Sequence, residues 1–461
     1  MKRRTERLQG QWWWNSRHKY PGLLEIDGRH TTLHLNGRFP GFKSYEAVGR
    51  GARSARQVVR GRTSDGRDFT LVDCVEVTTS RSVGRPRSER ATYSASWGIE
   101  GAHFASFDDL RFTHIALSCD YLNELVGQTF IHPTYSKDLR SFEFSYQAPA
   151  PLSADLGAFR LELSQAVPVQ LSTTFQVREM AEAVIDAKGF VPFEQLWEGP
   201  VATVRSAFGF MTEMRLLVHG VRAAYGRQRR WCRLLGFGEA GRRPRQLPDH
   251  PVRQFLFTAR GLTDPSWPKV LGRWATIRDE LHSVLALYSA ATMELTLHAE
   301  LRFLALAQAL ETYHRTRFKE TVLPRDQHRE RKRRVLAALA PADRDWVTPA
   351  LAWSNELTLR QRLQRLYEKV PRPLVDHLPQ IGTLVQEIAD TRNYLTHFGE
   401  RKPDVLSGFR LSETTDNMRH VLQYLLLLEL GFSENDATGI AHRSFIRDLS
   451  RSRVLRFMGT T

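Results

Sequence analysis

The chain has 461 residues, of which 41% are hydrophobic and 25% charged, a composition typical of a folded protein with two or three domains. Its formal net charge of +16 favours a polyanionic partner such as a nucleic acid. The longest apolar run is far too short to cross a bilayer and no apolar segment follows the basic start, so we expect no membrane span and no signal peptide.

Residues 1–180 are predicted to form a β-rich N-terminal domain. Short segments of alternating polar and apolar residues are separated by hairpin dipeptides such as Asn36-Gly37 and Asp65-Gly66. The spacing of these segments favours a β-sandwich-like arrangement of antiparallel sheets. Strands are expected at residues 69–77, 112–117, 139–146, 159–163 and 169–177.

Residues 181–267 are predicted to be a mixed connector that belongs to the N-terminal region. We expect a helix within residues 193–210 and strands at residues 214–225, 230–237 and 252–258. Nine arginines from Arg227 to Arg260 accompany only two acidic residues, Glu239 and Asp249. This excess fits an RNA-contacting ridge and a solvated surface equally well.

From Pro268 onward the apolar residues recur at helical spacing, so residues 268–461 are predicted to form an all-α bundle. The chain is therefore expected to have an α+β fold, with the β-rich region first. One predicted helix carries a basic run that is a candidate for RNA binding, formed by Arg329, Arg331, Lys332, Arg333 and Arg334.

Residues 374–398 are predicted to form one amphipathic helix. Its apolar residues recur at spacings of three, four and seven, at Leu378, Ile381, Val385, Ile388 and Leu395. Arg392 continues this stripe, where a guanidinium is costly unless a partner holds it. Asn393 and His397, one turn apart, share a neighbouring face. Spacing alone leaves a structural interpretation open, in which Arg392 caps or pairs and His397 is an ordinary histidine at a helix end.

The pattern Arg392-Asn393-x-x-x-His397, late in a helical domain, resembles the signature of the HEPN ribonuclease superfamily. FLALAQALETYHR at residues 303–315 resembles the second core helix of the ApeA-like HEPN group. GQWWW at residues 10–14, PGLL at residues 21–24 and LHLNG at residues 33–37 resemble the β-rich N-terminal domain of the same antiphage proteins. The resemblance covers most of the chain.

The resemblance implies a metal-independent endoribonuclease of an abortive-infection system that cuts tRNA. It further implies a homodimer formed through the HEPN domain, and a β domain that senses a phage-derived trigger, such as a protein, and restrains the nuclease. The cysteines Cys74, Cys119 and Cys232 lie far apart and suit a reducing compartment, so a cytoplasmic location is expected. No phosphate-binding loop, metal cluster or dinucleotide fingerprint is visible, so neither a cofactor nor a metal is expected.

The residue types at this site suit the cleavage of RNA through its own 2′-hydroxyl. Such a reaction needs a base, an acid for the leaving oxygen and a cation for the phosphorane. His397 can act as acid or base, Arg392 can hold two phosphate oxygens, and Asn393 can orient either partner. Glu311 and His314 are possible supporting residues in the same cleft. Alternatively, Glu311 pairs with Arg315 one turn further along, an interpretation that we favour.

Two other functions remain open on the sequence. A non-catalytic HEPN module that binds RNA or protein would use the same arginine and histidine as structural residues. A DNA-binding regulator has only the positive charge in its favour, because no recognition helix is evident.

Overall fold

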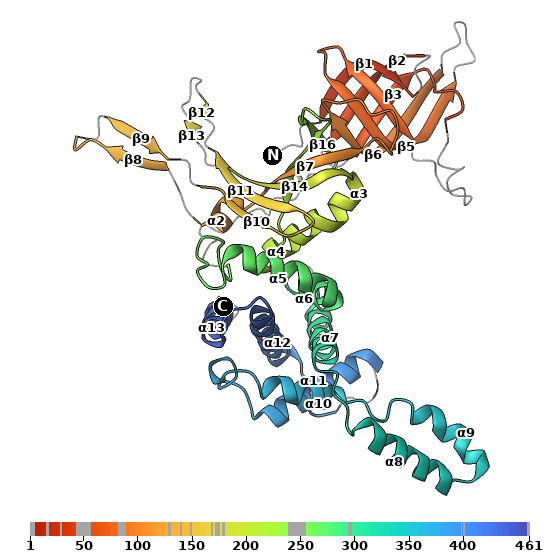
Figure 1. The fold of residues 1–461 in the computed structure, drawn as a ribbon, viewed down its shortest axis with the longest axis vertical. Coiled ribbons are helices and arrows are strands. Elements are labelled where there is room, and N and C mark those ends of the chain that lie inside the picture. The colour runs from red at the N-terminus through yellow and green to blue at the C-terminus, as the bar shows by residue number, and fades with distance from the viewer. Residues whose placement is uncertain are drawn as a thin grey trace. The chain divides into compact units, whose positions relative to one another are not determined.

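The computed structural model describes residues 5–14, 18–27, 30–42, 57–81, 89–127, 131–138, 141–147, 150–166, 169–170, 176–177, 180–237, 255–293, 297–397, 399 and 402–458 (Figure 1). The chain divides into two compact units, Met1–Gly272 and Arg273–Thr461. They are called here the N-terminal unit and the helical unit. The predicted fold class, a β-rich region followed by a helical bundle, is confirmed.

Six antiparallel strands of the N-terminal unit close into a barrel. Their order is β1-β2-β3-β6-β5-β4, and β4 pairs again with β1. The ring closes, in place of two stacked sheets, because β6 bonds to both β3 and β5. The strands are β1 (Glu6–Trp13), β2 (Tyr20–Asp27), β3 (His30–Asn36), β4 (Val58–Thr63), β5 (Asp68–Arg81) and β6 (Glu89–Glu100).

The barrel interior is built from alternate residues of these strands. In β3 the buried positions are Thr31, Leu33 and Leu35, which follows from the two-residue repeat of a strand. Trp12 is fully buried at the centre of this core. Gly61 on β4 allows the indole of Trp12 to fit, because a Cβ there would lie 2.0 Å from the ring.

The remaining long strands continue the same sheet away from the barrel. The order is β10-β11-β14-β7-β15-β16-β6, so β6 belongs to both parts. Two short hairpins, β8 (Ile131–Tyr135) with β9 (Phe142–Tyr146) and β12 (Val169–Gln170) with β13 (Gln176–Val177), are separate from it. The strands are β7 (Arg111–Cys119), β10 (Leu152–Asp155), β11 (Arg160–Ala166), β14 (Met180–Pro192), β15 (Val218–Tyr225) and β16 (Arg230–Leu235).

Short helices pack against this part of the sheet. They are α2 (Leu122–Val126), α3 (Phe193–Leu196), the π-helix η1 (Trp197–Val201) and α4 (Ala202–Thr212). The helix expected within residues 193–210 is therefore present as three consecutive segments. Phe193 of α3 lies beside Phe112 of β7, with ring centroids 6.1 Å apart, which fixes the helix on the sheet.

Most predicted strands are found, and two are wrong over their described parts. The single strand expected at residues 169–177 is a hairpin, because Val169 of β12 pairs with Val177 of β13 in antiparallel register. Residues 255–258 of the strand expected at 252–258 form no strand. The backbone N–H of Leu256 donates to Met211, and Ala259 donates to Leu125, so these groups bond to helical segments instead of a strand neighbour. Residues 139–140, 171–175, 252–254 and four arginines of the expected ridge (Arg242, Arg243, Arg245 and Arg253) lie outside the described residues.

The helical unit is centred on α7 and α12. α7 packs against α6, α10, α11 and α12, and α12 is buried along most of its length. The helices are α5 (Trp267–Glu280), which begins in the N-terminal unit, α6 (His282–Met293), α7 (Ala299–Phe318), α8 (Arg325–Ala338), α9 (Pro341–Ala350), α10 (Leu359–Tyr367), the 3₁₀ turn η3 (Arg372–Leu374), α11 (Ile381–His397), α12 (Gly408–Glu429) and α13 (Glu434–Met458). Among the described helices, none is both long and apolar enough to cross a membrane.

The helix predicted at residues 374–398 begins later than expected. α11 starts at Ile381, and Leu378 lies in the turn before it. Pro379 explains the difference, because proline lacks a backbone N–H and disfavours the helical conformation of the residue before it. The apolar stripe of α11 is therefore shorter, with Leu384, Val385 and Ile388 buried.

Candidate functional site

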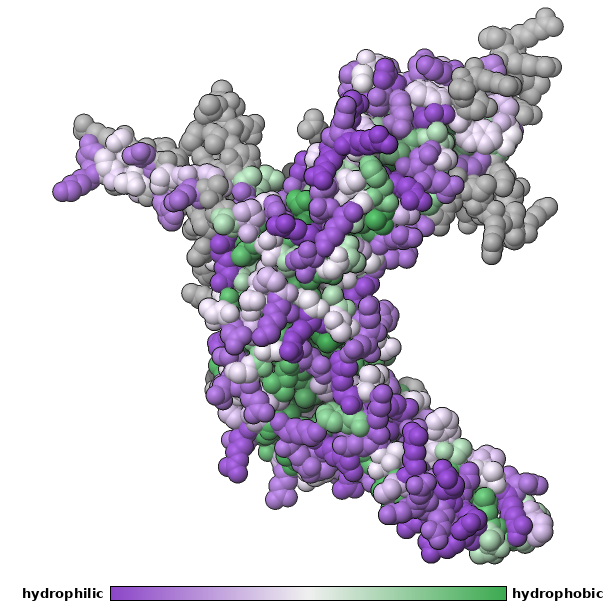
Figure 2. Space-filling view, viewed as in Figure 1, coloured by the Kyte–Doolittle hydropathy of each residue, from purple (hydrophilic) through white to green (hydrophobic). Residues whose placement is uncertain are grey.

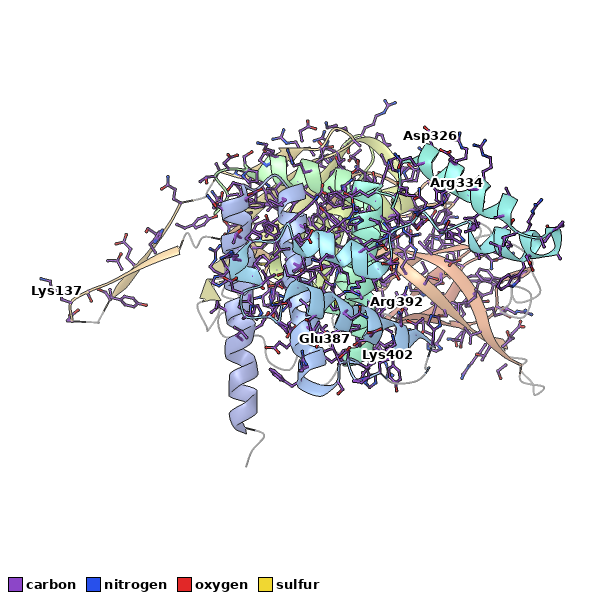
Figure 3. All side chains as sticks on the ribbon, turned by 90° about the horizontal axis from the view of Figure 1, so that it is seen from below. Lys137, Asp326, Arg334, Glu387, Arg392 and Lys402 are labelled. Carbon is purple, nitrogen blue, oxygen red and sulfur yellow. The ribbon has the colours of Figure 1, made fainter. Side chains whose placement is uncertain are left out.

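The last turns of α11 carry the three residues predicted to perform chemistry. Burial of Val385 and Ile388 holds one face of the helix against the bundle. Thr391 is also buried, and its Oγ1 accepts a hydrogen bond of 2.8 Å from the backbone N–H of Leu406. This contact ties the end of α11 to the segment before α12. Arg392, Asn393 and His397 therefore belong to an anchored helix, on which Figure 3 labels Arg392.

Arg392 is partly buried and has a partner on another helix. Its Nη2 lies 3.7 Å from Oε2 of Glu311 on α7, and its Nη1 donates to Oδ1 of Asn393 at 3.3 Å. The arginine side chain is 29% exposed, so the guanidinium is paired and still accessible. The expectation that a cation in this stripe needs a partner is thus met by Glu311.

Glu311 links two arginines. Its Oε1 accepts from Arg315 at 3.4 Å, which is the favoured alternative from the sequence, and Arg315 also lies 3.1 Å from Glu356. Its Oε2 is buried and accepts no hydrogen bond from the described residues, so the ion pair with Arg392 is its main electrostatic contact. The carboxylate therefore pairs along α7 and also faces Arg392.

A shallow cavity of about 400 Å³ lies beside this ion pair. It is lined by residues of α7, of α10 and its start, and of α11: Glu311, Leu357, Thr358, Leu359, Arg360, Gln386, Ala389, Asp390, Arg392 and Asn393. α10 begins here because Thr358 and Gln361 form a reciprocal capping box. Arg360 thereby adds a second cation to the cavity, a residue that helical spacing alone did not single out.

Asp390 is ionised within this cavity at neutral pH. Burial acts to raise the pKa of Asp390, but hydrogen bonds from Lys402 at 2.8 Å and Gln386 at 2.6 Å outweigh it and hold the pKa below its usual value. The negative charges of Asp390 and Glu311 are therefore both paired with cations. An anion entering the cavity would meet the guanidinium groups of Arg360 and Arg392.

His397 is the last residue of α11 and is exposed to solvent. It does not line the cavity, and no hydrogen bond or ion pair holds its ring within the part of the chain that the structure describes. It lies one helical turn beyond Asn393, as the spacing predicts. An exposed imidazole with an ordinary environment is accessible to a substrate and suited to proton transfer.

His314 does not share this environment. Its side chain is 1% exposed, and its ring packs against Phe318 with a centroid distance of 5.0 Å. Nδ1 lies 3.5 Å from Arg362, and Nε2 lies 3.7 Å from Glu320. Burial lowers the pKa of His314 to about 4, so the ring is neutral at pH 7. The expectation that His314 lines the cleft is not met, because α7 turns this residue into the bundle.

The predicted basic run lies on a different element from the cavity. Arg329, Arg331, Lys332, Arg333 and Arg334 are all on α8, and all but the partly exposed Lys332 are fully exposed. The cavity residues come from α7, the α10 region and α11 instead. The structure thus places these RNA-binding candidates apart from the lining of the cavity.

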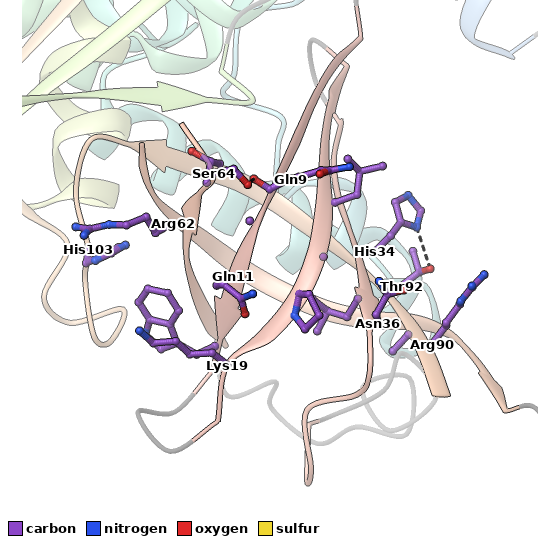
Figure 4. Close-up of a pocket in the computed structure, with 18 residues that line it drawn as sticks. Gln9, Gln11, Lys19, His34, Asn36, Arg62, Ser64, Arg90, Thr92 and His103 are labelled. Carbon is purple, nitrogen blue, oxygen red and sulfur yellow. Dashed lines mark hydrogen bonds between the residues drawn. The ribbon is translucent and has the colours of Figure 1, made fainter. Parts of the chain in front are cut away.

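The N-terminal unit has a larger cavity, of about 1110 Å³, on the outer wall of its barrel (Figure 4). The lining includes outward-facing polar residues of β1 and β3, and none of its side chains is acidic. Lys19 lies over the ring of Trp13 at 4.9 Å, and His34 bonds to Thr92 at 3.2 Å. Sequence reasoning missed this surface, although the polar positions alternating with the core of these strands mark it.

No group of three or more His, Cys, Asp or Glu side chains among the described residues is placed to hold a metal ion. The three cysteines are buried, and burial raises the pKa of each thiol. They therefore behave as small core residues, as the sequence suggests.

Comparisons with known proteins agree with these two units. Residues 7–198 match the family model ApeA N-terminal domain 1, and residues 304–436 match the family model Apea-like HEPN. No curated protein and no solved structure matched the chain. The second match contains Glu311, the basic helix α8 and the Arg392–His397 pattern, and the first contains the whole barrel. The chain therefore has the ApeA-like architecture, an ApeA-type N-terminal domain followed by an Apea-like HEPN domain.

Proposed function

We propose that this protein is a metal-independent endoribonuclease of an antiphage, abortive-infection defence system, and that it cuts tRNA. Both family matches support an antiphage HEPN protein. The observation that carries the enzymatic proposal is the accessible guanidinium of Arg392, paired with Glu311 and lying on the same anchored helix as an exposed His397.

In the proposed reaction the 2′-hydroxyl of RNA attacks the adjacent phosphorus, and the 5′-oxygen leaves. His397 takes the hydroxyl proton or gives a proton to the leaving oxygen. Arg392 binds the non-bridging phosphate oxygens, whose charge grows in the transition state, and Asn393 orients the phosphate. Glu311 holds Arg392 in place. The products are a 2′,3′-cyclic phosphate and a 5′-hydroxyl.

One chain offers a single histidine for two proton transfers. We therefore propose a homodimer through the HEPN domain, in which two copies of α11 contribute their histidines to one composite site. The exposed position of His397 at the end of α11 supports this arrangement, since its ring is available to a second copy.

We also propose that the N-terminal region, residues 1–267, restrains the nuclease and responds to a phage-derived trigger such as a protein, and that the nuclease domain covers residues 268–461. A growth-arresting nuclease must be inactive in an uninfected cell. A trigger then needs about 5.5 kcal/mol of preference for the active state to shift the population from 1:99 to 99:1. The cytoplasm, where tRNA is found, is the proposed location.

A non-catalytic HEPN module that binds RNA or protein is the second candidate. The ion pair between Arg392 and Glu311 favours it, because such a pair also stabilises a bundle without chemistry. Only this second candidate predicts that RNA stays intact even after phage infection has supplied the trigger.

The test is incubation of the purified protein with total tRNA in excess EDTA, with and without lysate of phage-infected cells as the source of the trigger, followed by mapping of the RNA ends. We expect cleavage that leaves cyclic phosphates, and the same new ends in cells that express the wild type but not His397→Ala. Strict dependence on added Mg²⁺ would contradict the mechanism, and intact RNA under all conditions would favour the binding module.

A further inference from the structure

Helices α8 and α9 form a hairpin in which the structure buries no residue. The two helices lie side by side and extend away from the other helices of the helical unit (Figure 1). Helices of 14 and 10 residues are marginal in water unless an apolar face is buried against something else. The hairpin therefore presents a surface that its own unit does not cover.

Polar contacts fix this hairpin at both ends without burying it. At its base, Asn355 accepts from the backbone N–H groups of Val322 and Leu323 at 2.9 and 2.8 Å. His328 and Ser354 are 2.9 Å apart. At its tip, Nε of Arg344 donates to the carbonyl of Leu339 at 3.0 Å, which caps the end of α8. The hairpin is thus a defined arm with a fixed base.

Two tryptophans of this arm face solvent. Trp346 on α9 is 81% exposed and Trp353, just after α9, is 72% exposed, the two highest values among the exposed large hydrophobic residues that the structure describes. By contrast, Trp12, Trp267 and Trp274 are at most 4% exposed. Large aromatic rings left in water at such values indicate a surface that binds a partner.

The charge of the arm indicates which partner this is. α8 has six basic residues against two acidic ones, Asp326 and Glu330. Within the described chain, no hydrogen bond or ion pair neutralises Arg331, Lys332, Arg333 or Arg334. Figure 3 labels Asp326 in the first turn of α8 and Arg334 eight residues further along the helix. In Figure 2 this region is strongly hydrophilic, with a hydrophobic patch near its tip. Two such arms would repel each other, whereas a polyanion would neutralise them.

The antiparallel hairpin brings both kinds of group onto one arm. Trp346 lies in the second half of α9, nearer the tip of the arm, and Trp353 follows α9 near the base. Its neighbour Ser354 lies 2.9 Å from His328 in the first turn of α8. Cations that bind phosphates beside aromatic rings that stack on bases form the usual surface for single-stranded nucleic acid. Paired bases already stack on one another, so a duplex uses the cations but not the rings.

We propose that the α8–α9 hairpin is an RNA-docking arm that binds unpaired nucleotides of the substrate, with α8 on the phosphates and Trp346 and Trp353 stacked on bases. The choice of RNA over DNA rests on the proposed function. The arm would hold a single-stranded loop of the substrate and so select where the RNA is cut.

The test uses the full chain with His397→Ala, which prevents loss of the probe, in EDTA at 50 and 200 mM salt. Fluorescence anisotropy measures the Kd for a fluorescein-labelled 20-nucleotide oligouridine and for an RNA duplex of the same length. We expect the double variant Trp346→Ala/Trp353→Ala to raise the Kd for oligouridine at least tenfold, and the Kd for the duplex less than threefold. Trp346→Phe/Trp353→Phe should restore most of the affinity, because phenylalanine also stacks.

Two controls separate the aromatic and electrostatic contributions. Phe190→Ala removes an exposed aromatic ring of the N-terminal unit, 46% exposed, and should leave both Kd values unchanged. Replacing Arg331, Lys332, Arg333 and Arg334 with glutamine should weaken binding to both probes and flatten the salt dependence. Melting temperatures should change little, since none of these side chains on the arm is buried.

The proposal is overturned if the double tryptophan variant binds oligouridine like its parent. It is also overturned if that variant loses only self-association in sedimentation experiments, which would make a second copy the occupant. Cleavage by the chain with His397 intact is measured in parallel. RNA binding that depends on the tryptophans, without cleavage, would refute the nuclease but support the docking arm. Cleavage that is unchanged in the tryptophan variant would support the nuclease but refute the docking arm.

Discussion

Single residues at the end of α11 differ in how firmly their surroundings hold them. Arg392 has a carboxylate partner 3.7 Å away, whereas His397 is exposed beyond the cavity lining. A phosphate group that binds between them would meet a preorganised cation and a histidine that is free to adjust. The two residues therefore call for separate substitutions.

Arg392→Ala and His397→Ala are each expected to abolish RNA cleavage and toxicity while the protein stays folded. The partly exposed ion pair of Arg392 contributes about 1 kcal/mol, which corresponds to a few degrees in Tm for a domain of this size. Cleavage assays and melting curves check the prediction. Arg410→Ala is the matched control, because it breaks a comparable pair with Glu387 outside the cavity and should leave cleavage intact. A collapse of Tm in the two site variants would make the site structural.

Glu311→Gln distinguishes positioning of Arg392 from simple pairing along α7. The amide keeps the shape of the side chain but removes the charge that faces Arg392, so we expect cleavage to fall ten- to hundredfold as the guanidinium loses its orientation. Arg315→Gln removes the other partner of Glu311, together with the ion pair between Arg315 and Glu356, and should have little effect on cleavage. Equal losses in the two variants, measured as kcat/KM, would argue that Glu311 acts only through helix stability.

At the scale of elements, one face of α7 lines the cavity and another face packs in the core of the bundle. Glu311 points to the cavity, while His314, three residues further on, is buried between Phe318, Arg362 and Glu320. The same helix therefore places one titratable residue beside the proposed chemistry and another in the packing of α10 against α7. Substitution of His314 should therefore change stability and leave catalysis unchanged.

The folded protein should lose stability between about pH 6.5 and 4 through His314. Its pKa is near 6.5 in the unfolded chain and about 4 in the fold, so in this window the unfolded state binds more protons and stability falls as pH falls. His314 changes the free energy of unfolding by at most about 3 kcal/mol, and this stability is fully present above pH 6.5. The measurement is the difference in Tm between pH 7.5 and 4.5 for wild type and His314→Gln.

His314→Gln should show a smaller fall in Tm over this range than the wild type. His397→Ala serves as the control, because it also removes a histidine but one that is exposed and lies on another helix. If His314→Gln follows the wild-type curve, the buried ring is not the group that titrates.

At the scale of the whole molecule, the division into two units lets control and chemistry be separated. The residues assigned to chemistry all fall in Arg273–Thr461, and the barrel with its large outer cavity falls in Met1–Gly272. A sensor needs a surface of its own, and the cavity lined by Lys19, His34 and Arg90 is available for this role. The proposed restraint can therefore be tested by removing the N-terminal region.

Residues 268–461 expressed alone are expected to fold, dimerise and be more toxic than the full chain in uninfected cells. The reason is that removal of the N-terminal region removes the bias toward the inactive state. Growth curves, sedimentation and circular dichroism check the three parts of this prediction. His397→Ala in the fragment should abolish toxicity. A folded, dimeric fragment that is no more toxic than the full chain would refute restraint by the N-terminal region.

Local spacing was sufficient to predict much of this protein. Alternating residues such as Leu33 and Leu35 identify a strand, and the separation of Asn393 and His397 places them on one helical face, because both repeats arise from backbone geometry within a few residues. The main exception, the late start of α11, also has a local cause in Pro379.

Tertiary structure decided which of these elements face one another. Closure of the barrel depends on two pairings between strands far apart in the sequence, β3 with β6 and β1 with β4. The partner of Arg392 lies on α7, and the burial of His314 depends on α10, so neither could be read from the stripe of one helix. The exposure of Trp346 and Trp353 likewise follows from the absence of a covering element, whereas their apolar character alone would predict burial. Long-range packing makes these choices, because a helical or strand repeat specifies an apolar face but not the surface that covers it.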